Sequence, residues 1–236
     1  MRLLLTRPEP DARRTAAALR ALGHEAVLAP LVRIDTMPDA PIGAGPWGAI
    51  LVTSANAAHA IAAHGRVAAL RELPVFAVGS RSAQAMRAAG FGTVTSADGG
   101  LDDLVRLVAG TAKPGAPLLY LAGEERSGDL AGDLRARDFA VHSVVVYRAV
   151  AASGLPGAAA EALASGVDGV LHFSRRSAEA YVNAARGAGM LAGALKPAHF
   201  CLSAQVAEPL ARAGAAIVRI APRPAEAALI ELVGPA

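Results

Sequence analysis

One stretch decides the fold, and it reads His142-Ser143-Val144-Val145-Val146-Tyr147-Arg148-Ala149-Val150. Three consecutive β-branched valines are typical of a strand buried on both faces, which is the signature of a parallel sheet. Tyr147 and Arg148 then interrupt the apolar run. An earlier stretch, 26–34, is built alike, with a buried strand followed by Pro30 and Arg33. We expect both stretches to leave one sheet and cross to another, with a binding cleft between the two sheets.

Length and composition favour a cytoplasmic protein of one or two domains. A chain of 236 residues forms one large domain or two of about 100 to 120 residues each. The single cysteine, Cys201, excludes an internal disulfide framework. The apolar run within residues 1–8 is too short for a signal peptide, and no run of about 18 apolar residues occurs. We expect a protein that is neither exported nor membrane-spanning.

The charged residues indicate which classes of binding partner to expect. The net charge is +3, aromatic residues make up 4% of the chain, and Lys113 and Lys196 are the only lysines. Arginine, the dominant basic residue, pairs carboxylates bidentately, which favours an anionic small molecule. A GC-rich genome, which enriches arginine everywhere, is the alternative explanation. Basic runs interleaved with aromatics are absent, so we expect no nucleic-acid partner.

Short apolar runs alternate with alanine-rich helical stretches, a pattern that predicts an α/β fold with parallel sheets. The predicted strands lie near 2–6, 25–29, 48–52, 74–78, 93–95, 117–121, 140–146, 168–172, 198–202 and 215–219. The predicted helices lie near 11–22, 55–64, 81–89, 100–108, 127–137, 157–165, 175–187, 204–213 and 224–233.

An internal repeat explains why the strands are too many for one small sheet. Three pairs of segments resemble each other at offsets of about 120 residues: 47–58 and 167–178, 75–90 and 198–214, and 19–27 and 134–141. We therefore predict two flavodoxin-like parallel-sheet domains joined by a two-stranded linker. Domain 1 is discontinuous, and domain 2 lies within it. The predicted bounds are 1–33 and 150–236 for domain 1, 37–145 for domain 2, and 34–36 and 146–149 for the linkers.

Small polar residues follow four predicted strands and directly precede helices. Helix N-termini at the carboxyl edge of an open sheet hold anions through backbone amides, so four such ends facing one cleft favour a polyanionic ligand. Plain helix capping is the alternative at each one. The four groups are Thr53-Ser54, Gly79-Ser80-Arg81-Ser82, Ser174-Arg175-Arg176-Ser177 and Ser203-Ala204-Gln205, and 119–126 makes a fifth strand end.

Cofactor motifs are missing. The stretch 43–48 matches G-x-G-x-x-G, but a dinucleotide site needs a strand before it and a helix after it, whereas here the strand follows. His59 and His64 are spaced so that they do not share one helix face, and the other histidines are scattered. We expect no metal and no cofactor.

Several of these pieces together resemble the uroporphyrinogen-III synthase family over nearly the full chain. The pieces are Thr6-Arg7-Pro8, Pro30-Leu31, Val52-Thr53-Ser54-Ala55-Asn56, Ala77-Val78-Gly79 with Ser82-Ala83 and Gly90, Gly123 with Arg126, and Val146-Tyr147. The resemblance implies two flavodoxin-like domains and a cofactor-independent, cyclising hydro-lyase. The linear tetrapyrrole hydroxymethylbilane would lose its hydroxyl, and its ring D would be inverted through a spiro intermediate as the macrocycle closes to uroporphyrinogen III.

The resemblance and the strand ends together give the expected site. Tyr147 matches the family's tyrosine that assists departure of the hydroxyl, and the eight carboxylates of the substrate suit a cleft of amides and arginines. The expected partners are hydroxymethylbilane and, transiently, the preceding pathway enzyme, and we expect a monomer. The expected substrate-binding residues are Thr6, Arg7, Thr53, Ser54, Ala55, Asn56, Gly79, Ser80, Ser82, Gly123, Ser174, Arg175, Arg176, Ser203, Ala204 and Gln205.

The chain departs from the family pattern in three places. The segment 202–207 carries Gln205 and Val206 where the family commonly has two threonines, and Ser82 stands where threonine is common. Arg175 and Arg176 replace small residues and would add direct carboxylate pairing. Two alternatives therefore remain beside the enzyme: a two-lobed sensor or binding protein for a small anion, without chemistry, and a degenerate paralogue that keeps only the fold.

Overall fold

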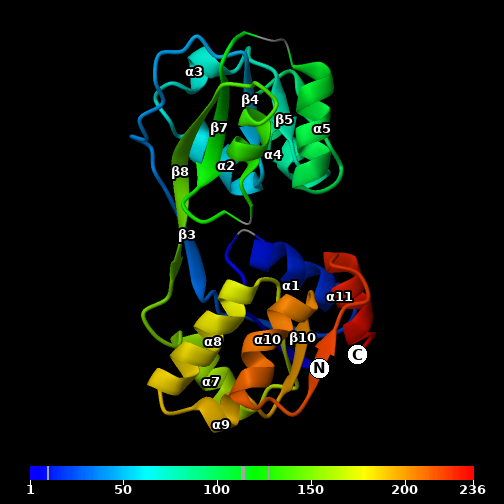
Figure 1. Ribbon diagram of the computed structural model, residues 1–236. Helices are drawn as coiled ribbons and strands as arrows, with labels where there is room; N and C mark the ends of the chain where they lie inside the picture. Colours follow the sequence, from blue (N-terminus) through cyan, green and yellow to red (C-terminus); the bar gives the residue numbers. More distant parts are fainter. Residues whose placement is uncertain (10, 113–114, 127) are drawn as a thin grey trace. The chain divides into compact units, whose positions relative to one another are not determined.

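The computed structural model (Figure 1) describes residues 1–9, 11–112, 115–126 and 128–236. The described residues form eleven strands, eleven helices and two sheets. Contacts within the chain group it into two compact units: Met1–Arg33 with Val150–Ala236 form unit 1, and Ile34–Ala149 form unit 2. Every helix in the described part is too short or too polar to cross a membrane.

Unit 1 has a five-stranded sheet in which all neighbours run parallel. Its strands are β1 (Arg2–Leu5), β2 (Glu25–Leu28), β9 (Gly169–His172), β10 (Ala198–Cys201) and β11 (Val218–Ile220), in the order β11-β10-β9-β1-β2. Numbered within the unit, this order is 2-1-3-4-5, which is the flavodoxin order. The predicted fold class is therefore confirmed in this unit.

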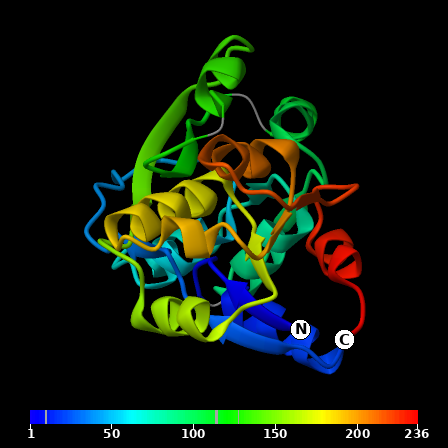
Figure 2. The same cartoon turned by 90° about the horizontal axis from the view of Figure 1, so that it is seen from below.

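Helices cover both faces of the unit 1 sheet. On one face, α1 (Asp11–Ala21) and α11 (Glu226–Val233) pack in an apolar cluster with Leu3, Leu5 and Phe200. The other face carries α7 (Gly157–Ser165), α8 (Arg175–Gly187), α9 (Leu191–Ala194) and α10 (Ala204–Ala213). Helices α8 and α10 lie side by side there in both views (Figure 1 and Figure 2). The three central strands, β10, β9 and β1, are accordingly buried along almost their whole length, whereas the edge strand β11 is largely exposed.

Unit 2 has a six-stranded sheet in the order β3-β8-β7-β4-β5-β6. Its strands are β3 (Val32–Thr36), β4 (Ala49–Val52), β5 (Val75–Ala77), β6 (Val94–Ser96), β7 (Leu118–Gly123) and β8 (Val141–Ala151). The five strands from β8 to β6 pair in parallel. One face carries α2 (Ala55–Ala62), α3 (Val67–Leu70) and α4 (Ser80–Ala88), and the other carries α5 (Leu101–Thr111) and α6 (Leu130–Arg135).

The two sheets are built on one plan, as the repeat predicts. Matching the resembling segments equates β9, β10 and β11 with β4, β5 and β6, and β1 and β2 with β7 and β8. Under this match the order β2-β1-β9-β10-β11 becomes β8-β7-β4-β5-β6, which is the order observed in unit 2. The five matched strands differ in where the chain enters the plan, because the two that come first in unit 1 come last in unit 2, and unit 2 adds β3 at the edge beside β8.

Two of the predicted strands need correction. Residues 26–34 are not one strand: β2 ends at Leu28 and β3 begins at Val32, because Pro30 between them has no amide to donate to a ladder. The segment 141–151 is one continuous strand, longer than predicted, but Val145 is only half-buried while Val144 and Val146 are buried. Full burial on both faces was therefore wrong for β8.

Strands β3 and β8 run antiparallel. The Met37 amide donates to the Val146 carbonyl at 2.8 Å, and the Ala152 amide donates to the Leu31 carbonyl at 2.9 Å. Residue numbers in β3 therefore rise in the direction in which those of β8 fall.

The sequence analysis also missed the four-residue helices α3 and α9, which are too short for a periodic pattern. The helix predicted near 127–137 is α6, and residue 127 lies outside the described residues.

Candidate functional site

In unit 2, two of the strand ends predicted to bind anions belong to the neighbouring strands β4 and β5. β4 is followed by Thr53 and by Ser54, the N-cap of α2, whose Oγ accepts a hydrogen bond from the Asn56 amide at 3.2 Å. β5 is followed by the N-cap of α4, Gly79, which offers no side chain. Because β4 and β5 are parallel neighbours, both helix N-termini lie at the carboxyl edge of one sheet. Free backbone amides at such an edge can hold carboxylates.

Unit 1 repeats this arrangement at β9 and β10. Ser174 caps α8, and its Oγ accepts from the Ser177 amide at 3.1 Å. Its backbone angles, φ −147° and ψ 149°, nearly equal the −150° and 146° of Ser54. Ser203 caps α10 at φ −157° and ψ 171°, close to the −155° and 168° of Gly79, and makes no side-chain cap bond. Capping explains the Ser54 and Ser174 hydroxyls, and it does not explain Ser203.

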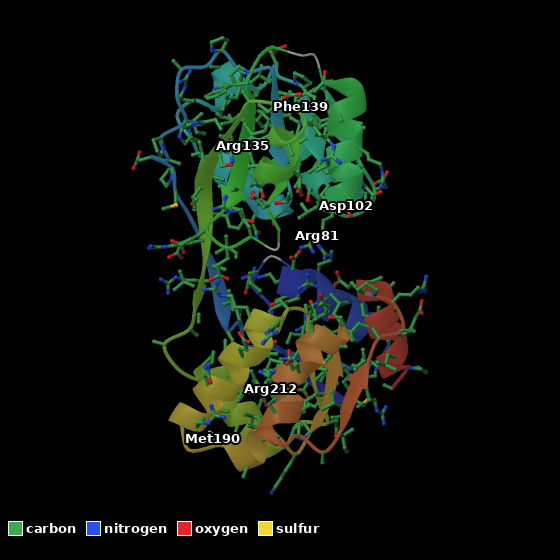
Figure 3. All side chains as sticks on the ribbon, viewed as in Figure 1. Arg81, Asp102, Arg135, Phe139, Met190 and Arg212 are labelled. Atoms are coloured by element: carbon green, nitrogen blue, oxygen red, sulfur yellow. The ribbon has the colours of Figure 1, made fainter. Side chains whose placement is uncertain are left out.

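The remaining predicted residues of these ends differ in exposure. Ser80, Ala204 and Gln205 are exposed in the first turns of α4 and α10, and Arg81, labelled in Figure 3, is exposed beside Ser80. Ala55 and Asn56 are partly buried in α2. Ser82 and Val206 are buried, with 5% of each exposed. The position at which valine replaces the family threonine therefore packs in the core.

Tyr147 lies in β8 opposite the end of β7. The register of the two strands shifts there, so that Gly123 pairs with Tyr147. The Glu124 amide donates to the Tyr147 carbonyl at 3.0 Å, which fixes the backbone at this irregularity. A Cβ placed on Gly123 would lie 2.7 Å from Cζ and 2.8 Å from the hydroxyl oxygen of Tyr147. The tyrosine ring thus covers the bare glycine, and its hydroxyl sits at the end of β7.

Tyr120 is a residue that the sequence analysis missed. It is 2% exposed in β7, and its hydroxyl lies 3.0 Å from Oγ1 of Thr53. Burial raises the pKa of Tyr120, the Thr53 hydrogen bond lowers it, and Tyr147 raises it further. The signal in the sequence was a lone tyrosine in an otherwise aliphatic buried strand, since a buried phenol needs a partner.

The Thr6 side chain is completely buried in unit 1. Its hydroxyl donates to the Leu171 carbonyl at 3.0 Å, so toward Nδ1 of His172, 3.5 Å away, it can only accept. Nε2 of His172 lies 3.1 Å from Nδ1 of His199, so the two neutral rings share one hydrogen bond. Burial lowers the pKa of both histidines, that of His199 to about 4. This chain of neutral groups occupies the Thr6 hydroxyl.

Arg7 is also held inside unit 1. Only 6% of it is exposed, and its guanidinium pairs with Asp11 and with Glu226, each at 3.1 Å. It also lies 4.0 Å from the centre of the Phe173 ring. Burial lowers the pKa of Arg7, while the charge of Glu226 opposes the shift. Arg7 thereby ties the end of β1 to α1 and α11, a structural role that the sequence did not indicate.

The two arginines after Ser174 are partnered as well. Arg175 contacts Glu179 at 2.8 Å and Glu208 at 3.0 Å, and Glu208 also pairs with Arg212, labelled in Figure 3. These carboxylates raise the pKa of Arg175, with the Glu179 hydrogen bond as the largest cause. Arg176 is partly buried and also interacts within the chain. A substrate carboxylate would have to compete with Glu179 and Glu208 for Arg175.

Metal ligation has no obvious basis in the part of the chain that the structure describes. That part contains no group of three or more His, Cys, Asp or Glu side chains placed to hold an ion. The chemical groups that the strand ends do offer are backbone amides, hydroxyls, the guanidiniums of Arg81 and Arg175, and the phenols of Tyr120 and Tyr147.

Comparisons with known proteins agree with this architecture. Residues 13–231 match the family model described as "Uroporphyrinogen-III synthase HemD". The crystal structure of uroporphyrinogen-III synthetase from Helicobacter pylori 26695 is similar, with a TM-score of 0.69, 17% identity, and coverage of 99% of this chain and 98% of that one. A mutant uroporphyrinogen III synthase from the extremely thermophilic bacterium Thermus thermophilus gives a TM-score of 0.53 at 17% identity, covering 99% and 96%. No curated protein matches the sequence.

Proposed function

The chain belongs to the uroporphyrinogen-III synthase family, and we propose that it works as a cyclising lyase that needs no metal or cofactor. Its function in haem biosynthesis is the conversion of hydroxymethylbilane to uroporphyrinogen III, with inversion of ring D. Hydroxymethylbilane loses its hydroxyl as water once that oxygen is protonated, and the electron-poor carbon left behind is attacked by the ring D carbon that already carries the bridge to ring C. In the resulting spiro intermediate the bond from ring D to this bridge breaks and re-forms at the other α carbon of ring D, which inverts the ring, and a proton is lost as the pyrrole is restored. The reaction involves no oxidation or reduction. The protein therefore needs only to position the substrate and to transfer protons.

One observation carries the proposed binding mode: each unit presents two helix N-termini with matched caps at the carboxyl edge of its sheet. The N-caps are Ser54, Gly79, Ser174 and Ser203. A polycarboxylate suits such edges, because amides at a helix N-terminus bind anions without needing a charged side chain. The ion pairs of Arg7 and Arg175 favour these amides over the arginines as the primary carboxylate sites.

Tyr147 is the proposed proton donor to the departing hydroxyl. Its phenol stands at the end of β7 beside Gly123, at the same carboxyl edge as Thr53. General-acid assistance of this kind is worth roughly a hundredfold to ten-thousandfold in rate. The proposed site thus combines amides that hold carboxylates with one phenol that handles a proton.

Product analysis tests the function directly. The protein is incubated with freshly generated hydroxymethylbilane, and uroporphyrinogen isomers I and III are separated. The spontaneous product is isomer I, so isomer III above the background without protein demonstrates catalysis. Isomer I alone would instead indicate a binding protein or a paralogue that has lost activity.

A further inference from the structure

Tyr120 is a polar residue inside an apolar cluster. It shares the cluster with Leu104 and Leu134, which belong to the helices α5 and α6 on that face of unit 2. A phenylalanine would fill the same space without burying a hydroxyl. The hydroxyl of Tyr120 therefore needs a partner, and that partner is Oγ1 of Thr53, 3.0 Å away.

Strand register brings the two residues together. β4 and β7 are parallel neighbours in which Leu51 pairs with Tyr120 and Val52 with Leu121. Thr53 follows directly at the carboxyl end of β4, and the long tyrosine side chain reaches it from inside the sheet. Tyr120 is buried, whereas Thr53 is only half-buried. Thr53 thus stands between a buried phenol and the edge where helix α2 begins.

The direction of this hydrogen bond decides what Thr53 can do. A hydroxyl has one proton, so if Thr53 donated to Tyr120 it could only accept from a ligand, and a carboxylate has no proton to give. If Tyr120 donates instead, the Thr53 proton is free for a ligand. A phenol is a stronger acid than an aliphatic alcohol, so of the two hydroxyls, 3.0 Å apart, that of Tyr120 is the better donor and that of Thr53 the better acceptor.

We propose that Tyr120 is a positioning residue whose hydroxyl donates to Thr53 and so turns the Thr53 hydroxyl toward a carboxylate of the tetrapyrrole. This inference rests on the proposed function and adds to it a residue that touches no substrate. Two hydroxyls in series also polarise each other, which strengthens the outer hydrogen bond.

The test uses kcat and KM for isomer III formation by the full chain and three variants, Tyr120→Phe, Thr53→Val and the double variant. Loss of a binding contact that is equal in ground state and transition state raises KM and leaves kcat unchanged. We expect Tyr120→Phe to raise KM roughly threefold to tenfold, with kcat within about twofold. The double variant should be no worse than Thr53→Val alone, because Tyr120 acts only through Thr53.

Two controls accompany these variants. Tyr181→Phe removes another buried phenol, whose hydroxyl donates to the Ala194 carbonyl at 2.8 Å in unit 1, and should leave KM unchanged. Thr53→Ser keeps the hydroxyl and should stay close to the parent protein, with Tyr120→Phe raising KM in this background as well.

An unchanged KM in folded Tyr120→Phe overturns the inference, and so do KM effects of the two single variants that multiply in the double variant. If Tyr120→Phe does not fold, Thr53→Val provides the test. An unchanged KM in Thr53→Val would mean that the Thr53 hydroxyl does not bind the substrate, and Tyr120 would then have no contact to position. A parent protein that makes only isomer I overturns the proposed function and the inference together. A parent that makes isomer III while Tyr120→Phe keeps its KM overturns the positioning role alone.

Discussion

The ring of Tyr147 occupies the space that a side chain at Gly123 would need, because a Cβ there would lie 2.7 Å from Cζ of the tyrosine. The shifted register between β7 and β8 produces this close approach. The Tyr147 ring, which carries the phenol that we propose as the acid, can therefore take this position only because residue 123 is a glycine.

Gly123→Ala should displace the Tyr147 ring. We expect a loss of about 1 to 3 kcal/mol in unfolding free energy from overpacking, and turnover to isomer III reduced at least about tenfold because the acid is misplaced. Gly110→Ala in α5 is the matched control, since nothing lies within 4 Å of a Cβ there and the helix gains from alanine. Chemical denaturation and product analysis measure both effects. Unchanged turnover in Gly123→Ala would mean that the ring position is not needed.

Tyr147→Phe should keep the melting temperature and lower turnover to isomer III by at least about tenfold. The loss is less than the full value of general acid catalysis, because solvent can also protonate a hydroxyl that leaves partly unaided. Steady-state rates at saturating substrate provide the measurement. A variant as fast as the parent would make Tyr147 structural, and catalysis would then rest on positioning of the reacting rings.

The cap residues should separate stability from binding. Ser54→Ala and Ser174→Ala each remove a side-chain cap bond and should cost about 1 kcal/mol of unfolding free energy. Ser203→Ala removes no such bond and should cost less. If the anion sites are backbone amides, KM should change little in all three. A large rise in KM from the alanine variants would point to hydroxyls as direct ligands.

Acid should destabilise unit 1 through its buried histidines. The pKa of His199 falls from an ordinary value near 6.5 to about 4 in the folded protein, and that of His172 is also lowered. The unfolded chain therefore binds more protons between these values, so stability is full above about pH 6.5 and falls as the pH drops toward 4, by about 3 kcal/mol for His199.

The His199→Leu variant isolates this effect. Its melting temperature should fall less between pH 7 and pH 5 than that of the parent, whatever its absolute stability. Arg7 and Glu226 remain in both proteins, and the lowered pKa of Glu226 makes their contribution fall as well, so the difference between the two slopes reports on the histidines. Parallel slopes would contradict the shifted pKa of His199.

Prolonged dialysis against a chelator should leave turnover unchanged, because the proposed chemistry uses only amides, hydroxyls and phenols. The measurement is the rate of isomer III formation before and after dialysis. Activity that disappears and returns with one specific metal would disprove cofactor independence.

The sequence predicted what local patterns encode. The valines at 144–146 predicted a strand, and the resembling segments predicted two sheets on one plan, which the strand orders confirm. The ion-pair partners of charged side chains could not be predicted from the sequence. Arg7 meets Glu226, and Arg175 meets Glu208, only after helices that are distant in the sequence pack together. Tyr120 was missed for the same reason, since its partner Thr53 lies on a neighbouring strand.

The order of synthesis determines when the unit 1 sheet can be completed. β1 lies between β2 and β9 in its sheet, so residues 1–33 cannot complete that sheet until the segment beginning at Val150 has left the ribosome. The continuous segment Ile34–Ala149 emerges before Val150–Ala236 does and can fold alone, as domains generally do during synthesis. Leu3, Leu4 and Leu5, fully buried in the finished protein, can pair with β2 during that interval but have no β9 neighbour yet. The nascent chain therefore leaves the β9-facing edge of β1 open for most of its synthesis, an unpaired strand edge that the finished sheet covers.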